Sequence, residues 1–65
     1  MKINDIVKVV CVDAFYYGAL GKIDEVFEDE YHVVFEMIDE ITGEVSIYDE
    51  CYYYDYEIEL VKEGE

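Results

Sequence analysis

The residues of this sequence with the greatest capacity for binding chemistry are tyrosines and carboxylates near its C-terminal end. Tyr52, Tyr53 and Tyr54 form an uninterrupted run, and acidic residues flank the run on both sides. Tyrosine rings supply rigid apolar contact and carboxylates pair with arginine, so this composition is typical of an interface centre. A second acidic stretch occurs earlier in the chain. The candidate binding residues are Asp24, Glu25, Glu28, Asp29, Glu30, Asp49, Glu50, Tyr52, Tyr53, Tyr54, Asp55, Glu57 and Glu59.

These residues also allow simpler structural roles. Two or three of the tyrosines, counting Tyr48 and Tyr56, can cap one end of a core while their hydroxyls stay in water. The acids can likewise serve only to keep the chain soluble. A net charge of magnitude about 2 to 8 already suffices for that purpose in a small domain, whereas this chain carries −14.

The distribution of this charge restricts the class of partner. The chain contains 18 acidic residues against four lysines and no arginine. Between Ile23 and Val61 there are fourteen acids and no basic residue other than His32. Such a surface repels nucleic acid and anionic membrane and attracts basic proteins. We therefore expect a basic protein partner, no direct nucleic-acid binding and no membrane binding.

Catalysis and metal binding receive little support from the pattern. The paired carboxylates Asp24-Glu25 and Asp39-Glu40 need a partly desolvated pocket to shift a pKa, and a small barrel fills its own interior. The only histidine, His32, has no serine or cysteine at a recognisable spacing. Zinc needs three or four convergent ligands and calcium an EF-hand-type loop, and neither pattern occurs. We expect no enzymatic activity, no metal and no cofactor.

The elements that must position the candidate residues are short strands. A chain of 65 residues makes one domain, residues 1–65, and 54% apolar residues provide enough material for a core. Period-two patterns and turn residues predict five strands, a 3-10 turn before the last strand and no long helix. The stretch 15–35, a loop leading into a hairpin, is the centre with which the other strands pair. The expected strands are 6–12, 22–27, 31–38, 45–48 and 57–61, with the turn inside 49–56.

Alternation within each strand predicts which side chains face inward. His32 is expected on the outward face beside Val34 and Glu36. The uneven spacing of two apolar residues in 22–27 predicts a bulge at Asp24-Glu25. The expected core residues are Val7, Val9, Cys11, Leu20, Ile23, Val26, Tyr31, Val33, Phe35, Ile58 and Leu60.

Glycines and cysteines complete the sequence-based expectations. Gly18 and Gly21 allow positive φ in the loop whose aromatic residues fold back as a lid, and Gly43 is the positive-φ residue of a hairpin turn. Cys11 and Cys51 are expected as reduced thiols in apolar surroundings, because a secreted scaffold of this size usually carries four or more cysteines. No apolar run approaches the roughly 18 residues of a membrane span, so we expect a cytosolic chain.

The order of these elements resembles the small five-stranded SH3-like barrel. The residues Asp5-Ile6-Val7-Lys8-Val9, followed by Phe15-Tyr16-Tyr17-Gly18-Ala19-Leu20-Gly21-Lys22-Ile23, are similar to the pattern of KOW-type modules. The resemblance implies an all-β barrel whose loops and faces bind nucleic acid or protein tails through basic residues. In this chain the sign of that charge is inverted, so the resemblance supports the fold and disfavours nucleic-acid binding.

In composition and size the chain also resembles the acidic DNA-mimic inhibitors of phages and mobile elements. Glu57 and Glu59 are expected to project a row of anions from one strand at roughly 6.6 Å spacing, similar to successive phosphates. The resemblance implies an inhibitor of a basic host enzyme in the bacterial cytoplasm, such as a CRISPR effector, a restriction enzyme or a DNA glycosylase, with an anti-CRISPR role foremost. The alternative is an acidic adaptor that leaves nucleic-acid binding intact. The chain is expected as a monomer or homodimer.

Overall fold

The computed structural model describes residues 1–64 and shows one antiparallel sheet. Within these residues the only helical element is a single 3-10 turn, and no helix is long and apolar enough to cross a membrane. The elements in chain order are β1 (Ile6–Val9), β2 (Leu20–Val26), β3 (Glu30–Ile38), β4 (Val45–Tyr54), η1 (Asp55–Glu57) and β5 (Ile58–Lys62).

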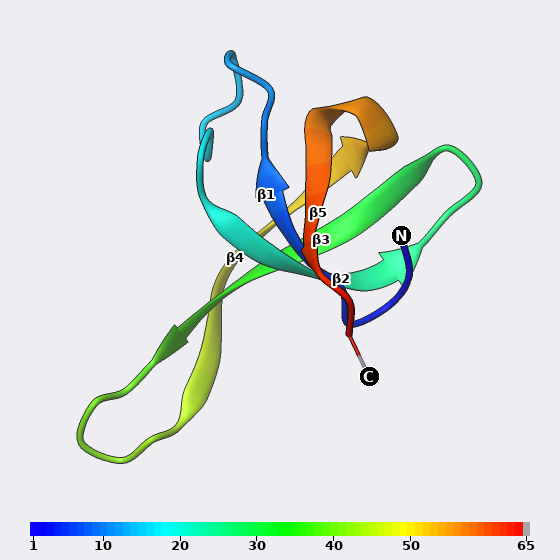
Figure 1. The fold of residues 1–65 in the computed structure, drawn as a ribbon. Coiled ribbons are helices and arrows are strands. Elements are labelled where there is room, and N and C mark those ends of the chain that lie inside the picture. The colour runs from blue at the N-terminus through cyan, green and yellow to red at the C-terminus, as the bar shows by residue number, and fades with distance from the viewer. Residues whose placement is uncertain (65) are drawn as a thin grey trace.

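The strand order in the sheet is β4-β3-β2-β1-β5, which leaves β4 and β5 as the two edges of a sheet that does not close. β3 runs through the molecule from the β2–β3 turn to the β3–β4 hairpin, and the far end of that hairpin extends away from the other strands (Figure 1). We call this extension, residues 37–47, the arm. The all-β architecture with five strands and a 3-10 turn before the last is as the sequence predicts.

The core lies on one side of the sheet, the inner face, and follows the predicted alternation. Val7, Val9, Ile23 and Val33 are completely buried, and Phe35 is the largest side chain among them. Cys11 and Cys51 are free thiols in partly buried positions. Tyr16 folds back from the 10–19 loop, and its ring stacks on Phe35 with a centroid distance of 4.4 Å, so one aromatic residue of the predicted lid does cover the core.

Three predicted backbone features are confirmed, and the loop position predicted for Gly21 is wrong. Gly18 and Gly43 have φ of 85° and 74°, as turn residues. Gly21 lies in β2 without positive φ, but a Cβ there would approach Val33 Cγ1 to 2.5 Å. The requirement at Gly21 is therefore close packing of β2 against the core residues of β3. The bulge predicted at Asp24-Glu25 is present as a register shift between Ile23 and Glu25.

Several predicted boundaries are wrong. β1 ends at Val9 rather than residue 12, and β4 continues to Tyr54 instead of ending at Tyr48. The segment 49–54 is therefore strand, because it pairs with β3 along its whole length, and only residues 55–57 form the 3-10 turn. The last strand begins at Ile58, one residue later than predicted.

Three expected core residues lie elsewhere. Leu20, Val26 and Leu60 are all more than 40% exposed. Leu20 pairs with Lys8 on the outer face and cannot plug the core. Val26 is the last residue of β2, and Leu60 lies in β5, an edge strand of the sheet.

A buried carboxylate joins the two ends of the described chain. Asp5 is 2% exposed, and its side chain accepts hydrogen bonds from the backbone N–H groups of Lys2 and Gly64 at 2.9 and 2.8 Å. The bond from Gly64, followed by that from Lys2, holds the pKa of Asp5 below its ordinary value. This latch fixes the end of β5 beside the start of β1.

Candidate protein-binding surface

The outer face of the sheet carries most of the candidate residues. Val33 and Phe35 point into the core, so the alternate residues of β3 point outward. Directly paired residues of antiparallel strands share a face, and the pairing of His32 with Tyr52 and of Val34 with Glu50 places both partners on the outer face. The sequence prediction for the two faces of β3 is confirmed.

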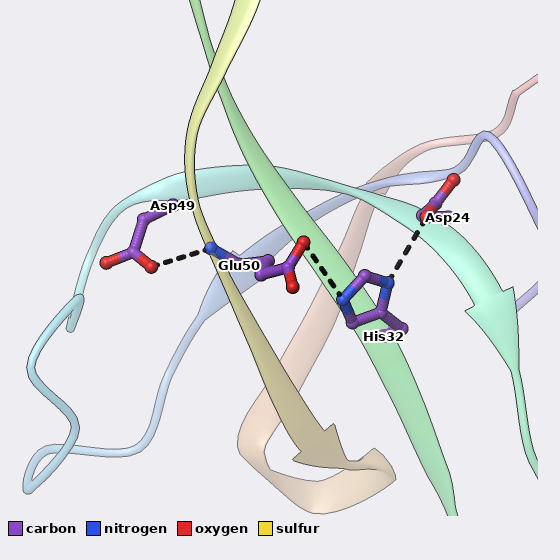
Figure 2. Close-up of polar contacts among 4 residues, drawn as sticks. All are labelled: Asp24, His32, Asp49 and Glu50. Carbon is purple, nitrogen blue, oxygen red and sulfur yellow. Dashed lines mark hydrogen bonds and ion pairs between the residues drawn. The ribbon is translucent and has the colours of Figure 1, made fainter.

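His32 is the centre of this face. Although it points outward, it is only 8% exposed, because side chains of both neighbouring strands cover it. Its Nδ1 hydrogen-bonds Asp24 Oδ2 at 3.2 Å, and its Nε2 lies 3.6 Å from Glu50 Oε2 (Figure 2). Nε2 is buried and has no hydrogen-bond partner in the part of the chain that the structure describes. The imidazole therefore lies between carboxylates from β2 and β4 at one point of the surface.

The β-bulge in β2 doubles the acidic charge at this point. A bulge sets two residues of one strand opposite a single residue of its neighbour. Glu25 is paired with His32 by register, and the extra residue, Asp24, contacts the same ring. Both carboxylates consequently lie beside His32 rather than on opposite sides of the sheet.

Aromatic rings adjoin the carboxylates. The Tyr52 ring lies 4.8 Å from His32 and 5.9 Å from Phe27, and both Tyr52 and Phe27 are more than 40% exposed. Glu30 is paired with Tyr54 on the same face. We call this surface the acidic face; its residues are Asp24, Glu25, Phe27, Glu30, His32, Glu50 and Tyr52.

The carboxylates of the acidic face are not neutralised by lysine. Among residues 1–64 the structure has one lysine–carboxylate ion pair, Lys22 Nζ to Glu36 Oε1 at 2.7 Å, which lies beyond the acidic face along β2 and β3. Asp24, Glu25 and Glu50 are exposed, and within the described part of the chain only His32 lies within ion-pairing distance of any of them. The face thus combines fixed negative charge with exposed aromatic rings.

Other predicted site residues lie away from the acidic face. Tyr53 is 6% exposed and belongs to the core, so it adopts the structural role that the sequence left open. Tyr54 and Tyr56 stack on each other with centroids 5.7 Å apart and remain exposed. Glu28 and Asp29 lie at the exposed β2–β3 turn.

The predicted anionic row of Glu57 and Glu59 is wrong. Glu57 belongs to the 3-10 turn, where its Oε1 accepts a hydrogen bond from the backbone N–H of Tyr54 at 2.9 Å and forms a capping box. Glu59 is in β5, opposite Lys8. The two carboxylates therefore have different surroundings, and Asp55 is exposed within the turn.

Asp49 also serves the fold rather than the acidic face. It is paired with Phe35, and in Figure 2 its carboxylate points away from His32. The Tyr16 hydroxyl donates a hydrogen bond to Asp49, which raises the pKa of Tyr16 to about 12 and lowers the pKa of Asp49. This contact fastens the 10–19 loop to β4.

His32 and Phe27 are the members of the acidic face that the sequence did not indicate as binding residues. Alternation had placed His32 correctly on the outer face, but its contacts depend on the bulge and on the register of β4, which are properties of the folded sheet.

Among residues 1–64, no group of three or more histidine, cysteine and acidic side chains is arranged to hold a metal ion. Comparison with protein-family models, with curated proteins and with solved structures finds no match for this chain.

Proposed function

We propose that this chain is a binding protein that occupies a basic nucleic-acid-binding site of a bacterial enzyme as a nucleic-acid mimic. Its most specific form is an anti-CRISPR protein of a phage or mobile element, acting in the host cytoplasm on a CRISPR effector. A restriction enzyme and a DNA glycosylase are the other candidate targets. The chain itself performs no catalysis in this proposal.

The proposed scaffold is the SH3-like barrel. A strand order of β4-β3-β2-β1-β5, with a long loop after β1 and a 3-10 turn between β4 and β5, supports this assignment. A barrel of this kind presents broad strand faces as well as loops. The acidic face is one such strand face, held rigid by the central strand β3.

The observation that carries the proposal is the uncompensated acidic face. Asp24 and Glu25 are consecutive residues at the bulge of β2, and Glu50 lies on β4, so these carboxylates stand on both sides of β3. Neighbouring strands are roughly 5 Å apart, which places the charges of β2 and β4 roughly 10 Å apart across His32. Tyr52 adds a ring able to fill the place of a base or an apolar hot spot. Lysine and arginine side chains that hold phosphates would accept such a surface and would attract it from a distance.

The test is competition on purified enzymes. A CRISPR nuclease with its guide RNA, a restriction endonuclease and a DNA glycosylase are each titrated with the protein in a DNA-binding assay. We expect at least one enzyme to lose its DNA as the protein binds, with an inhibition constant that rises with salt. A complex that contains enzyme, protein and DNA together would instead identify the chain as the acidic adaptor.

Charge-neutralising variants locate the surface. Asp24→Asn, Glu25→Gln and Glu50→Gln combined should slow association at least tenfold, because charges at the contact steer the encounter. The matched control is Asp13→Asn, Asp55→Asn and Glu59→Gln, which changes net charge equally at exposed positions outside the acidic face. Equal loss in both triple variants would show that total charge, and not this face, drives binding.

A further inference from the structure

The arm exposes apolar side chains along its length. Every residue from 37 to 50 is exposed, and Ile41 at the tip is 95% exposed. Beyond Phe35 the arm consists of β3 and β4 alone, because β2 pairs only with the first part of β3. A two-stranded hairpin is marginal in water, and contiguous exposed apolar side chains indicate an interaction site.

The apolar residues of the arm gather on one side of it. Ile38 pairs with Val45, and Glu36 pairs with Ile47. Because Glu36 and Ile38 alternate with core residues of β3, all four side chains lie on the outer face of the sheet. Three of them are aliphatic and more than half exposed: Ile38, Val45 and Ile47.

The same outer face contains a hollow next to the arm. Ile6, Leu20 and Val34 provide its apolar lining, Lys22 and Glu36 lie at its side, and its volume is about 210 Å³. Leu20 is 57% exposed. We call this feature the apolar hollow. It lies over β1, β2 and β3, and one of its lining residues, Glu36, is the outward-facing residue of β3 that precedes Ile38 of the arm.

Three of the four lysines surround the apolar hollow. Lys22 pairs with Ile6 across β1 and β2, Lys8 pairs with Leu20, and Lys62 pairs with Ile6 across β1 and β5. The structure gives Lys8 and Lys62 no carboxylate within ion-pairing distance among residues 1–64.

Acidic residues also lie around the apolar hollow. Glu36 is paired with Lys22, Glu59 lies opposite Lys8, and Glu63 lies beside Lys62. Glu50 lies opposite Val34 at the β3 side of the hollow. Because three of the four lysines of the chain lie here, it is the part of the described surface where an acidic segment can meet cations.

The arm carries charge of the complementary sign. Its acids are Asp39, Glu40 and Glu44, and it contains no lysine or arginine. Asp39 is occupied within the turn, where it accepts hydrogen bonds from the N–H groups of Ile41 and Thr42. Glu40 and Glu44 remain available for cations of another molecule.

From these features we infer that the chain forms a two-fold symmetric dimer in which the arm of each copy packs into the apolar hollow of the other. The arm and the hollow lie side by side on one face, so a two-fold axis between them brings each opposite its counterpart, as an isologous interface requires. Glu40 and Glu44 of one copy approach Lys8 and Lys62 of the other. This inference is independent of the inhibitory function proposed above.

The dimer is tested by sedimentation velocity of the whole chain, at about 0.15 M salt so that the long-range repulsion between two acidic copies is screened. We expect the mass to rise from 7.7 kDa toward twice that value as concentration increases through the micromolar range. A chain that stays monomeric up to millimolar concentration would overturn the inference.

Two variants distinguish this interface from any other dimer. Ile47→Glu places a charge on the arm, and Leu20→Glu places a charge in the apolar hollow. A homodimer has two arm–hollow contacts, and each substitution disrupts both of them because both copies carry it. Each variant alone should therefore be monomeric, with dimer affinity reduced at least a hundredfold. In a mixture, the intact arm of one variant meets the intact hollow of the other, so one contact of two is restored and a heterodimer forms.

The mixture also decides between alternatives. If both variants still dimerise, the copies associate elsewhere, for example through the free edge of β4. If Leu20→Glu still dimerises and only Ile47→Glu is monomeric, arms contact arms, and the arm-in-hollow arrangement is wrong. It is also wrong if both variants are monomeric and the mixture remains so. Ile47→Thr and Leu20→Thr, which keep good strand formers at both positions, replace any glutamate variant whose circular dichroism spectrum departs from that of the parent.

Discussion

The two halves of β3 have the same secondary structure and opposite environments. From His32 to Phe35 every side chain is buried, including the two that point to the outer face, whereas Met37 and Ile38 are exposed. The difference follows from the neighbours. The first half lies between β2 and β4, and the second half pairs with β4 alone. Burial in this small sheet thus depends on the number of flanking strands more than on residue type.

This comparison separates the body of the molecule from the arm. The body contains the core, the 10–19 loop and the acidic face, and residues from three or more strands pack together in it. The arm contributes no buried residue. We therefore expect substitutions in the body to change the stability of the whole domain and substitutions in the arm to change association.

The largest effect is expected from Phe35→Ala, at the last position of the buried half. Loss of the ring that stacks on Tyr16 and fills the core should lower the free energy of unfolding by about 3 to 5 kcal/mol. This is enough to unfold a small domain. Urea denaturation followed by circular dichroism measures it. A variant that melts within a few degrees of the parent would contradict the division into body and arm.

A smaller loss is expected from Gly21→Ala, on the strand that covers the buried half. The new Cβ would lie 2.5 Å from Val33 Cγ1 and 3.1 Å from Phe35 Cε1. Overpacking of this kind costs about 1 to 3 kcal/mol. Gly43→Ala is an informative control, because its cost would come from positive φ with nothing within 4 Å of the added Cβ. If Gly21→Ala and Gly43→Ala lose equal stability, the close contact at Gly21 adds no large cost of its own. That result would show that β2 has room to move away from β3.

The third prediction concerns how the stability of the domain depends on pH through Asp5, which lies at the edge of the body. The pKa of Asp5 is lowered in the folded state, so its contribution to stability is present above the unfolded pKa of about 3.8 and is lost as pH falls through the folded value. Asp5→Asn should be less stable than the parent at pH 5. The two stabilities should then converge toward pH 2. Urea titrations at both pH values give the difference, and a gap that stays constant would show that the Asp5 carboxylate is not the titrating group.

The smallest effect is expected in the arm. Ile47→Thr removes exposed apolar surface and keeps a β-branched residue, so the free energy of unfolding should change by less than about 0.5 kcal/mol. Thermal melts at a concentration where the chain is monomeric measure this. A loss comparable to that of Gly21→Ala would mean that the arm is packed against the body within one molecule.

The sequence predicts the body well because its strands have one apolar side. Val7 and Val9 alternate with an outward lysine, and the two positive-φ glycines lie where the turn pattern requires them. The uneven spacing of the apolar residues Ile23 and Val26 likewise predicts the bulge between them. In each case a local pattern carries the information.

The sequence predicts β4 poorly because tyrosine suits both faces of a sheet. Tyr52 and Tyr54 are exposed on the outer face while Tyr53 is buried, so a true period of two is concealed in a run of identical residues. Leu20 is misplaced for a related reason, since the outer face also has an apolar region. The cluster around His32 depends on the pairing of three strands, which composition and spacing do not encode.

The latch made by Asp5 also determines how the domain yields to mechanical force. β1 and β5 are antiparallel neighbours, so the beginning of one lies beside the end of the other. Tension applied to the two ends would reach the two hydrogen bonds of Asp5 first. It would then open the β1–β5 ladder one pair at a time, as a zipper opens, rather than shear all the pairs together. Unfolding under tension at the two ends would therefore begin with the separation of β1 from β5.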